Sequence, residues 1–367
     1  MSFLAKHVKL YEKERSPLRA FFGGLMRTID WDERKHSVLM IDQRRLPEKL
    51  EIFQADTAER MIEAIQTMVI RGAPALGVAG AFTVALAALE LRNTSDPDWF
   101  TKLEQAAITI KSSRPTAVNL AWGVNRVMSI PGLLEESIEV AAEAMLNEAL
   151  SMAEEDINTN IKLARNGSTL INDGDVLMHH CNTGALAAVD WGTALGAIRF
   201  AHESGKKVKV LIDETRPRLQ GARLTAWECE QYGIPYEIIT DNAAGYFLQR
   251  GEVDAVFFGA DRVAANGDVV NKIGTYMLSL AANANKVPVY CVFPKSSVDL
   301  SIATGKDIII EEREPDEVLG ISFMGERVAP TSAHARNPAF DLTPHELISA
   351  WVTEDGVIYP PFSGTFQ

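Results

Sequence analysis

The spacing of hydrophobic and polar positions in the first third of the chain differs from that in the rest. In the first third, three short apolar runs separated by charged turns predict a small β-meander. Apolar residues at helical spacing then predict a series of helices. The expected strands cover residues 27–31, 38–41 and 50–53, and the expected helices begin near residue 57 and include 73–91, 100–111 and 118–127.

After residue 132, short apolar runs alternate with helical segments. Strands of this length that are apolar on both faces and separated by helices are typical of a parallel sheet covered by helices on each side. The expected strands are residues 176–180, 208–212, 236–239, 255–258, 289–293 and 308–310, and the expected helices are 134–165, 184–202, 217–232, 243–250 and 274–285. The predicted fold class is α/β, a Rossmann-like parallel-sheet domain preceded by a smaller β-meander and helical domain.

The dipeptide Pro131-Gly132 is the strongest break in the first half of the chain. A chain of 367 residues suits about two domains, at roughly 150 residues each. We therefore expect an N-terminal domain at residues 1–131 and a Rossmann-like catalytic domain at 132–367.

Charge and composition narrow the classes of partner. A net charge of −13 argues against a nucleic-acid or anionic-membrane surface, because both need a basic face. The apolar stretch at residues 73–91 is interrupted by Gly and Pro at its start and is expected to be a buried helix. The three cysteines lack CxxC spacing, and the N-terminus lacks the continuous apolar run of a secretory signal. A cytoplasmic protein is expected.

Polar and reactive side chains follow almost every predicted strand. Cys181, Asp213, Asp241 and Asp261 each come at or just after a strand end, where ligands bind in open α/β sheets. No GxGxxG, GxxxxGK[ST], HExxH or CxxC motif occurs, so neither a dinucleotide cofactor nor a P-loop is expected. The adjacent histidines His179 and His180 point to opposite faces of a strand, and no metal site is expected.

Six short motifs follow one another along the chain: IRGAPA at 70–75, SRPTAVNL at 113–120, HCNTG at 180–184, DETRP at 213–217, GADR at 259–262 and NKIGT at 271–275. In this order they resemble the successive signatures of the methylthioribose-1-phosphate isomerase family. That family is related to ribose-1,5-bisphosphate isomerases and to the regulatory subunits of a translation-initiation exchange factor. The resemblance implies a cofactor-free aldose–ketose isomerase of methionine salvage that forms a homodimer through its α/β domain.

The implied reaction needs two proton-handling groups. A phosphate on the anomeric carbon blocks the free aldehyde, so the enzyme must assist cleavage of the bond between C1 and the ring oxygen and then move a hydrogen from C2 to C1. One acid and one base meet this need, and the resemblance makes Cys181 and Asp261 that pair.

Position along the chain suggests how each group of the pair is tuned. Asp261 follows an apolar run at 256–260, where desolvation raises a carboxyl pKa; the plainer alternative is a turn-capping residue paired with Arg262. Cys181 precedes a predicted helix whose N-terminus would favour the thiolate. The alternative for Cys181 is an inert buried cysteine, as expected for Cys229 and Cys291.

Cations and backbone amides are expected to hold the phosphate, and they come from both predicted domains. Each of these side chains alone could equally be a surface ion pair or a capping group. Arg71 and Arg114 lie in the N-terminal domain, so the pocket is expected between the domains. The resemblance implies substrate contacts by Arg71, Gly72, Ala73, Arg114, Gln220, Asn271 and Lys272.

Three alternatives stay open. The substrate could be 5-deoxyribose 1-phosphate, which differs only by loss of the methylthio group, or ribose 1,5-bisphosphate, which would call for a second cationic cluster. The third is a non-catalytic subunit like the exchange-factor relatives. The joint presence of Cys181 and Asp261 favours an enzyme, since a scaffold has no need of a thiol and carboxyl pair.

Overall fold

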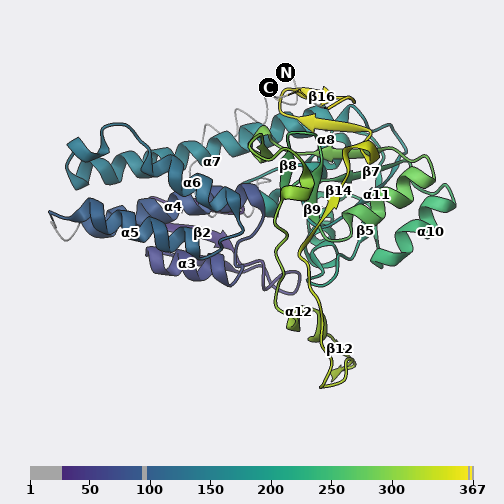
Figure 1. Ribbon diagram of the computed structural model, residues 1–367, viewed down its shortest axis with the longest axis horizontal. Helices are drawn as coiled ribbons and strands as arrows, with labels where there is room; N and C mark the ends of the chain where they lie inside the picture. The colour runs from purple at the N-terminus through teal and green to yellow at the C-terminus, as the bar shows by residue number, and fades with distance from the viewer. Residues whose placement is uncertain (1–26, 93–96, 363, 366–367) are drawn as a thin grey trace.

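A computed structural model describes residues 27–92, 97–362 and 364–365. The N-terminal segment, for which no secretory signal was expected, lies outside the described residues. A meander and helices form one end of an elongated molecule, and a helix-covered sheet forms the other (Figure 1). The predicted fold class is confirmed, with a parallel-containing sheet preceded by a small β region.

The meander consists of antiparallel strands in the order β1-β2-β3. The strands lie within two residues of their predicted positions. Their inward side chains, among them Ile29 and Met40, are buried. The bounds are β1 Ile29–Asp32, β2 Ser37–Ile41 and β3 Ile52–Ala55.

Five helices follow, packed around the alanine-rich helix α4. This is the one helix in the described part of the chain that is long and apolar enough to cross a membrane, but most of it is buried in the protein core. Helix α7 packs against α4 at one end of the molecule and against α8 (Ala194–Glu203) at the other. The bounds are α3 Ala58–Gln66, α4 Ala73–Arg92, α5 Trp99–Ser112, α6 Val118–Met128 and α7 Ile138–Ser168.

The larger sheet has the strand order β16-β15-β10-β7-β4-β5-β6. All neighbours are parallel except the edge strand β16. Within this sheet the chain runs first through β4, β5 and β6. It then crosses back to β7, on the other side of β4. The bounds are β4 Val176–His179, β5 Lys209–Asp213, β6 Tyr236–Ile239, β7 Ala255–Phe258, β10 Val289–Val292, β15 Ala350–Thr353 and β16 Gly356–Ile358.

Successive strand residues face opposite sides of this sheet and form two separate cores. Leu177 packs with α7, α8 and α9 (Ala226–Tyr232) on one face, and Met178 packs with the helices of the other face. Those helices are α10 Ala244–Gln249 and α11 Thr275–Ala284. The direction of strand order reverses between β4 and β7. The carboxyl ends of the strands at such a point are where α/β sheets bind ligands.

Smaller elements frame that point. A four-stranded sheet has the order β11-β8-β9-β14, and a hairpin of β12 and β13 projects from the body (Figure 1). The bounds are β8 Arg262–Ala264, β9 Val269–Lys272, β11 Val298–Asp299, β12 Ser322–Phe323, β13 Glu326–Arg327, β14 Phe340–Thr343 and α12 Asp316–Leu319. Short 3-10 turns lie at Leu133–Glu135, Ala185–Ala187, Asp241–Ala243, Lys295–Ser297, Gly305–Asp307 and His345–Leu347.

Two predicted elements are wrong. Residues 308–310 form no strand, and Ile309 is almost fully exposed. The helix expected at 184–202 is interrupted, because Trp191 and Gly192 take left-handed backbone conformations and Asp156 binds the Val189 amide. Only the later part of that segment is helical, as α8.

Candidate active site

All nine predicted site residues line one pocket at the carboxyl ends of β4 and β7. The pocket also receives side chains from the N-terminal helices and from the loops around β8, β9 and β14. The pocket therefore receives residues from both halves of the chain, where the sequence analysis expected it. The nine residues are Arg71, Gly72, Ala73, Arg114, Cys181, Gln220, Asp261, Asn271 and Lys272.

Cys181 follows β4 with a left-handed backbone, at φ 67°. This conformation is uncommon for a residue with a side chain and needs support from its surroundings. The Cys181 amide donates to Thr215 Oγ1 at 2.9 Å, and its carbonyl accepts from Thr225 Oγ1 at 2.7 Å. Two threonine hydroxyls therefore hold the thiol-bearing residue in a fixed orientation.

The expected thiolate-favouring helix N-terminus at Cys181 is wrong. The residues after it form a loop and a single 3-10 turn at Ala185–Ala187, with no amides aligned over several helical turns. Burial raises the pKa of the Cys181 thiol, and the charges of Lys272 and Arg71 oppose this rise. Nearby cations, rather than a helix dipole, are what can favour the thiolate here.

Asp261 comes after the buried strand β7, and its amide donates to Val270 O at 3.0 Å. Burial raises the pKa of its carboxyl, as expected from the sequence, and Lys272, Arg114 and Arg71 oppose the rise. The alternative ion pair with Arg262 does not form, because Arg262 approaches Asp299 instead, at 3.9 Å. Asp261 is thus a half-buried carboxyl that shares the pocket with three cations.

Arg71 reaches the pocket from the segment before α4. Its Nε donates to Gln43 Oε1 at 3.0 Å, Nη1 donates to the Asn182 carbonyl at 3.3 Å, and Nη2 donates to Asn182 Oδ1. The next residue, Gly72, has φ 102°, and a Cβ there would lie 2.3 Å from the Ala187 carbonyl oxygen. Only glycine fits this close approach of the two halves of the chain.

Arg114 and Lys272 bring further positive charge. Within the described residues, the Arg114 guanidinium has neither a hydrogen bond nor an ion pair, and burial lowers its pKa. Lys272 Nζ donates to Ala339 O at 2.7 Å and lies 4.2 Å from the centre of the Phe340 ring. Burial lowers the pKa of Lys272, against the charges of Cys181 and Asp261. These cations can bind an anionic ligand without first breaking an ion pair.

Two amide side chains add polar groups. Gln220 is buried, and its Oε1 has no hydrogen-bond partner among the described residues. An unpaired buried acceptor in a pocket suits a ligand hydroxyl. Asn271 Nδ2 donates to Thr275 Oγ1 at 2.9 Å, which fixes the amide beside Lys272.

Several pocket residues were missed from the sequence. Arg218 and Arg313 also line the pocket, and both bind the same carboxylate of Glu317, at 2.8 and 2.6 Å. Gln43 and Glu228 lie outside the pocket lining but contact its residues. Gln43 lies two residues after β2 and Glu228 lies within α9, but neither belongs to one of the quoted motifs, so the sequence analysis did not single them out.

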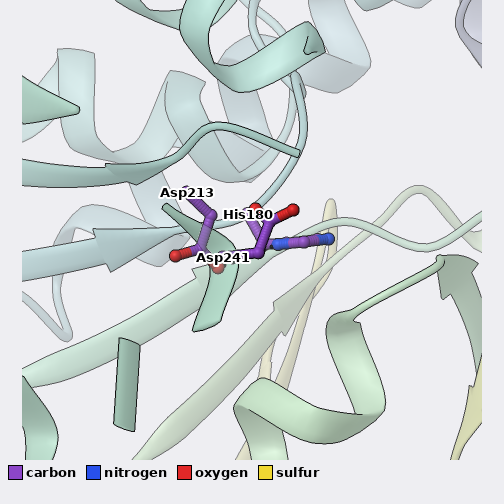
Figure 2. A group of neighbouring side chains, drawn as sticks. All are labelled: His180, Asp213 and Asp241. Carbon is purple, nitrogen blue, oxygen red and sulfur yellow. Dashed lines mark hydrogen bonds and ion pairs between the residues drawn. The ribbon is translucent and has the colours of Figure 1, made fainter. Parts of the chain in front are cut away.

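A buried histidine, His180, directly precedes Cys181 in the chain and lies close to Asp213 and Asp241 (Figure 2). His180 Nδ1 lies 2.9 Å from Asp213 Oδ2, and its Nε2 lies 2.9 Å from Ile273 O. Burial disfavours the charged ring, but the Asp213 carboxylate outweighs this and raises the pKa of His180. Asp241 lies within 4.8 Å of both, and its oxygens accept the amides of Thr215 and Arg216. The hydrogen bonds already formed account for this cluster as a brace between strand ends.

Sequence comparison points to one family. Residues 69–360 match the Initiation factor 2 subunit family. A methylthioribose-1-phosphate isomerase from Thermoanaerobacter sp. (strain X514) is 49% identical over 342 residues, which are 92% of this chain and 98% of the relative. One from Thermotoga maritima is 48% identical over 337 residues, covering 92% and 96%.

Solved structures agree with this assignment. The 5-methylthioribose 1-phosphate isomerase of Pyrococcus horikoshii matches with a TM-score of 0.82 and 40% identity, over 92% of this chain and 94% of its own. The translation initiation factor eIF-2B subunit delta of A. fulgidus matches with a TM-score of 0.80 and 43% identity, over 92% and 96%. By sequence and by fold, the chain belongs to the Initiation factor 2 subunit family.

Proposed function

We propose that this protein is a methylthioribose-1-phosphate isomerase, which converts 5-methylthioribose 1-phosphate to 5-methylthioribulose 1-phosphate in methionine salvage. The observation that carries the proposal is the presence of a buried thiol, Cys181, and a half-buried carboxyl, Asp261, in one cation-lined pocket. The relatives of that name support it, since they are similar over nearly their whole length.

Asp261 is the acid of the proposed mechanism. Its raised pKa favours the protonated carboxyl, which donates a proton to the ring oxygen as the bond from C1 to that oxygen breaks. Cys181 then removes the proton from C2 as the thiolate; burial raises the pKa of this thiol, and the charges of Lys272 and Arg71 oppose the rise. This leaves an enol between C1 and C2 that carries the phosphate on C1.

The second half returns both groups to their starting states. The Cys181 thiol gives its proton to C1, and the hydroxyl on C2 gives its proton to the Asp261 carboxylate. A ketone forms at C2, and C1 becomes a CH2 group that bears the phosphate. Protons balance over the cycle, and neither a redox cofactor nor a metal takes part in these steps.

The substrate-binding roles follow from the same geometry. Arg71, Arg114 and Lys272 are proposed to hold the phosphate, and the amides of Gly72 and Ala73 line the same side. Gln220 Oε1, which has no partner among the described residues, accepts from a sugar hydroxyl. Asn271 completes the set beside Lys272.

Ribose 1,5-bisphosphate is the strongest alternative substrate, because the pocket holds more arginines than the sequence suggested. Arg218 and Arg313 are both bound to Glu317, which leaves less positive charge for a second phosphate. The charges in the pocket give no comparable argument against 5-deoxyribose 1-phosphate. A non-catalytic subunit remains the alternative from a different class, since one structural neighbour is named as an initiation-factor subunit.

Phosphorus NMR of the purified protein with the three sugar phosphates side by side tests the proposal. We expect conversion of 5-methylthioribose 1-phosphate with the highest kcat/KM. Faster conversion of either other sugar would reassign the substrate. No conversion of any would reject the enzyme and favour the non-catalytic subunit.

The remaining proposals concern the whole molecule. We propose a cytoplasmic homodimer that associates through the α/β domain, and a division into domains at residues 1–131 and 132–367. Exposed apolar side chains on α11, Met277 at 60% and Leu280 at 41%, support association there. Light scattering of the purified protein at several concentrations tests the dimer, and a monomeric mass throughout would reject it.

A further inference from the structure

A buried carboxylate with no ion pair lies directly behind the pocket. Glu228, on α9, has no exposed surface. None of the ion pairs of the described residues includes it, and burial raises the pKa of its carboxyl, against its hydrogen bonds and the charge of Arg71. Burying a carboxylate without a direct partner is costly, so its hydrogen bonds indicate what it does for the protein.

Glu228 accepts hydrogen bonds from three donors around the loop after Cys181. Asn182 Nδ2 donates to Oε1 at 2.8 Å, the Ala185 amide donates to Oε2 at 2.7 Å, and the Leu186 amide donates to Oε1 at 3.4 Å. The fit is close, because a Cβ on Gly184 would lie 2.2 Å from Oε2. These donors require a side chain that accepts hydrogen bonds on both of its terminal oxygens, as a carboxylate does.

Asn182 is the centre of the network that Glu228 orients. Its Nδ2 also donates to Thr225 Oγ1 at 3.1 Å, and its Oδ1 accepts from Arg71 Nη2. Two acceptors therefore face the NH2 group, and a donor faces the oxygen. The Asn182 amide can satisfy these groups in one orientation only, and Glu228 is its charged acceptor.

The network reaches both Cys181 and Arg71. Thr225 gives its hydroxyl hydrogen to the Cys181 carbonyl at 2.7 Å, so Thr225 must accept from Asn182. On the other side, Arg71 uses one N–H on each of Nε, Nη1 and Nη2 to bind Gln43 and Asn182. One N–H remains on each terminal nitrogen, on opposite edges of the guanidinium, and each can donate to a ligand oxygen.

We propose that Glu228 is a positioning residue that, through Asn182, holds the phosphate-binding guanidinium of Arg71 in place relative to Cys181. It touches no substrate atom. The inference rests on the proposed function, because it takes the sugar phosphate as the ligand of Arg71. A carboxylate is required because it accepts on both oxygens and offsets the charge of Arg71.

Glu228→Gln tests the proposal in a double-mutant cycle with Arg71→Lys. Glutamine puts an NH2 group where an acceptor is needed, so Asn182 must turn or move and Arg71 loses its partner. We expect kcat/KM for 5-methylthioribose 1-phosphate to fall about tenfold or more, mainly through KM. In the Arg71→Lys background the same change should lower kcat/KM less than about threefold, because the guanidinium that Asn182 holds is already absent.

The controls separate positioning from general damage. Glu230→Gln alters an exposed glutamate two residues away and should leave kcat and KM unchanged. Asn182→Ala removes the central amide and should show the same non-additivity with Arg71→Lys, which keeps the test open if Glu228→Gln does not fold. An equal fall in kcat/KM from Glu228→Gln in the wild type and in Arg71→Lys, or an unchanged KM, would overturn the positioning role.

Calorimetric affinity for the same sugar phosphate gives the cycle a readout that does not need turnover. Binding by the wild type with non-additive losses in the variants supports the positioning role even if no conversion is seen. A wild type that converts substrate while Glu228→Gln behaves like Glu230→Gln overturns the positioning role alone. A wild type that neither binds nor converts the three sugar phosphates overturns the proposed function and this inference with it.

Discussion

Arg71 and Asn182 are joined by two hydrogen bonds, although they belong to opposite halves of the chain. Arg71 Nη1 and Nη2 bind the carbonyl and the side-chain oxygen of the same asparagine. A second link lies across the pocket, where Thr116 Oγ1 donates to Glu311 Oε2 at 2.7 Å. The N-terminal helices therefore supply cations to a site whose reactive groups lie on the sheet, and each half is incomplete without the other.

Replacing Asp261 with asparagine should abolish turnover. Asparagine keeps the shape of the carboxyl but cannot release a proton, and loss of a general acid costs about 10²–10⁴-fold in kcat. Because burial disfavours the charged Asp261 carboxyl, we expect no fall in melting temperature at pH 8. A phosphorus NMR assay and a thermal melt measure the two effects, and a kcat within tenfold of wild type would remove Asp261 from the mechanism.

Replacing Cys181 with serine should also stop turnover while substrate affinity is kept. A serine hydroxyl is a far weaker base than a thiolate, so kcat should fall about 10²-fold or more. Cys229→Ala is the matched control, since Cys229 is buried on α9 and does not line the pocket. Substrate affinity measured by calorimetry should stay within about threefold of wild type. If Cys181→Ser keeps full activity, the thiol has no part in catalysis.

Replacing Arg114 with alanine should weaken binding more than it slows the reaction. The Arg114 guanidinium has no partner among the described residues, so its removal leaves no protein group unpaired. Loss of a charged hydrogen bond to phosphate costs about 1.5–3 kcal/mol, or about 10- to 150-fold in KM. Arg60→Ala, on the exposed face of α3, should leave KM unchanged. A fall in kcat without a change in KM would contradict the phosphate role.

Much of the fold follows from local sequence pattern. The strands at Tyr236–Ile239 and Ala255–Phe258 were predicted with the observed bounds, because short runs of β-branched and aromatic residues between helices are typical of buried parallel strands. The later strands at Ala350–Thr353 and Gly356–Ile358 were missed, although the acidic turn between them is a hairpin signal. Residues 308–310 have the composition of a strand but pair with no neighbouring strand.

The site was predictable only in part. Position after a strand, at the sheet edge where ligands bind, made Cys181 and Asp261 candidates, and the resemblance to the isomerase family made them the expected pair. Gln43 and Glu228 could not be found, because their roles depend on hydrogen bonds to residues more than 25 positions away. The expected thiolate-favouring helix at Cys181 failed for a similar reason. Long-range contacts of Asp156 with Val189 break the helix that local pattern alone predicts.

That contact also predicts a pH effect on stability. Asp156, on α7, accepts the Val189 amide at 2.7 Å, and burial raises the pKa of its carboxyl from 3.8 to about 7, with Asp190 adding to the rise. The folded protein therefore holds a proton that the unfolded chain has released. Stability from this group is complete below pH 3.8 and is lost as pH rises to about 7.

The Asp156→Asn variant should lack this loss, because asparagine can still accept the Val189 amide but carries no charge. We expect its melting temperature to gain on that of wild type as pH rises from about 4 to 7, and the difference to level off above pH 7. Glu143→Gln, at an exposed position on the same helix, should follow wild type at every pH. A difference between Asp156→Asn and wild type that does not vary with pH would show that the Asp156 carboxyl is not protonated in the folded protein.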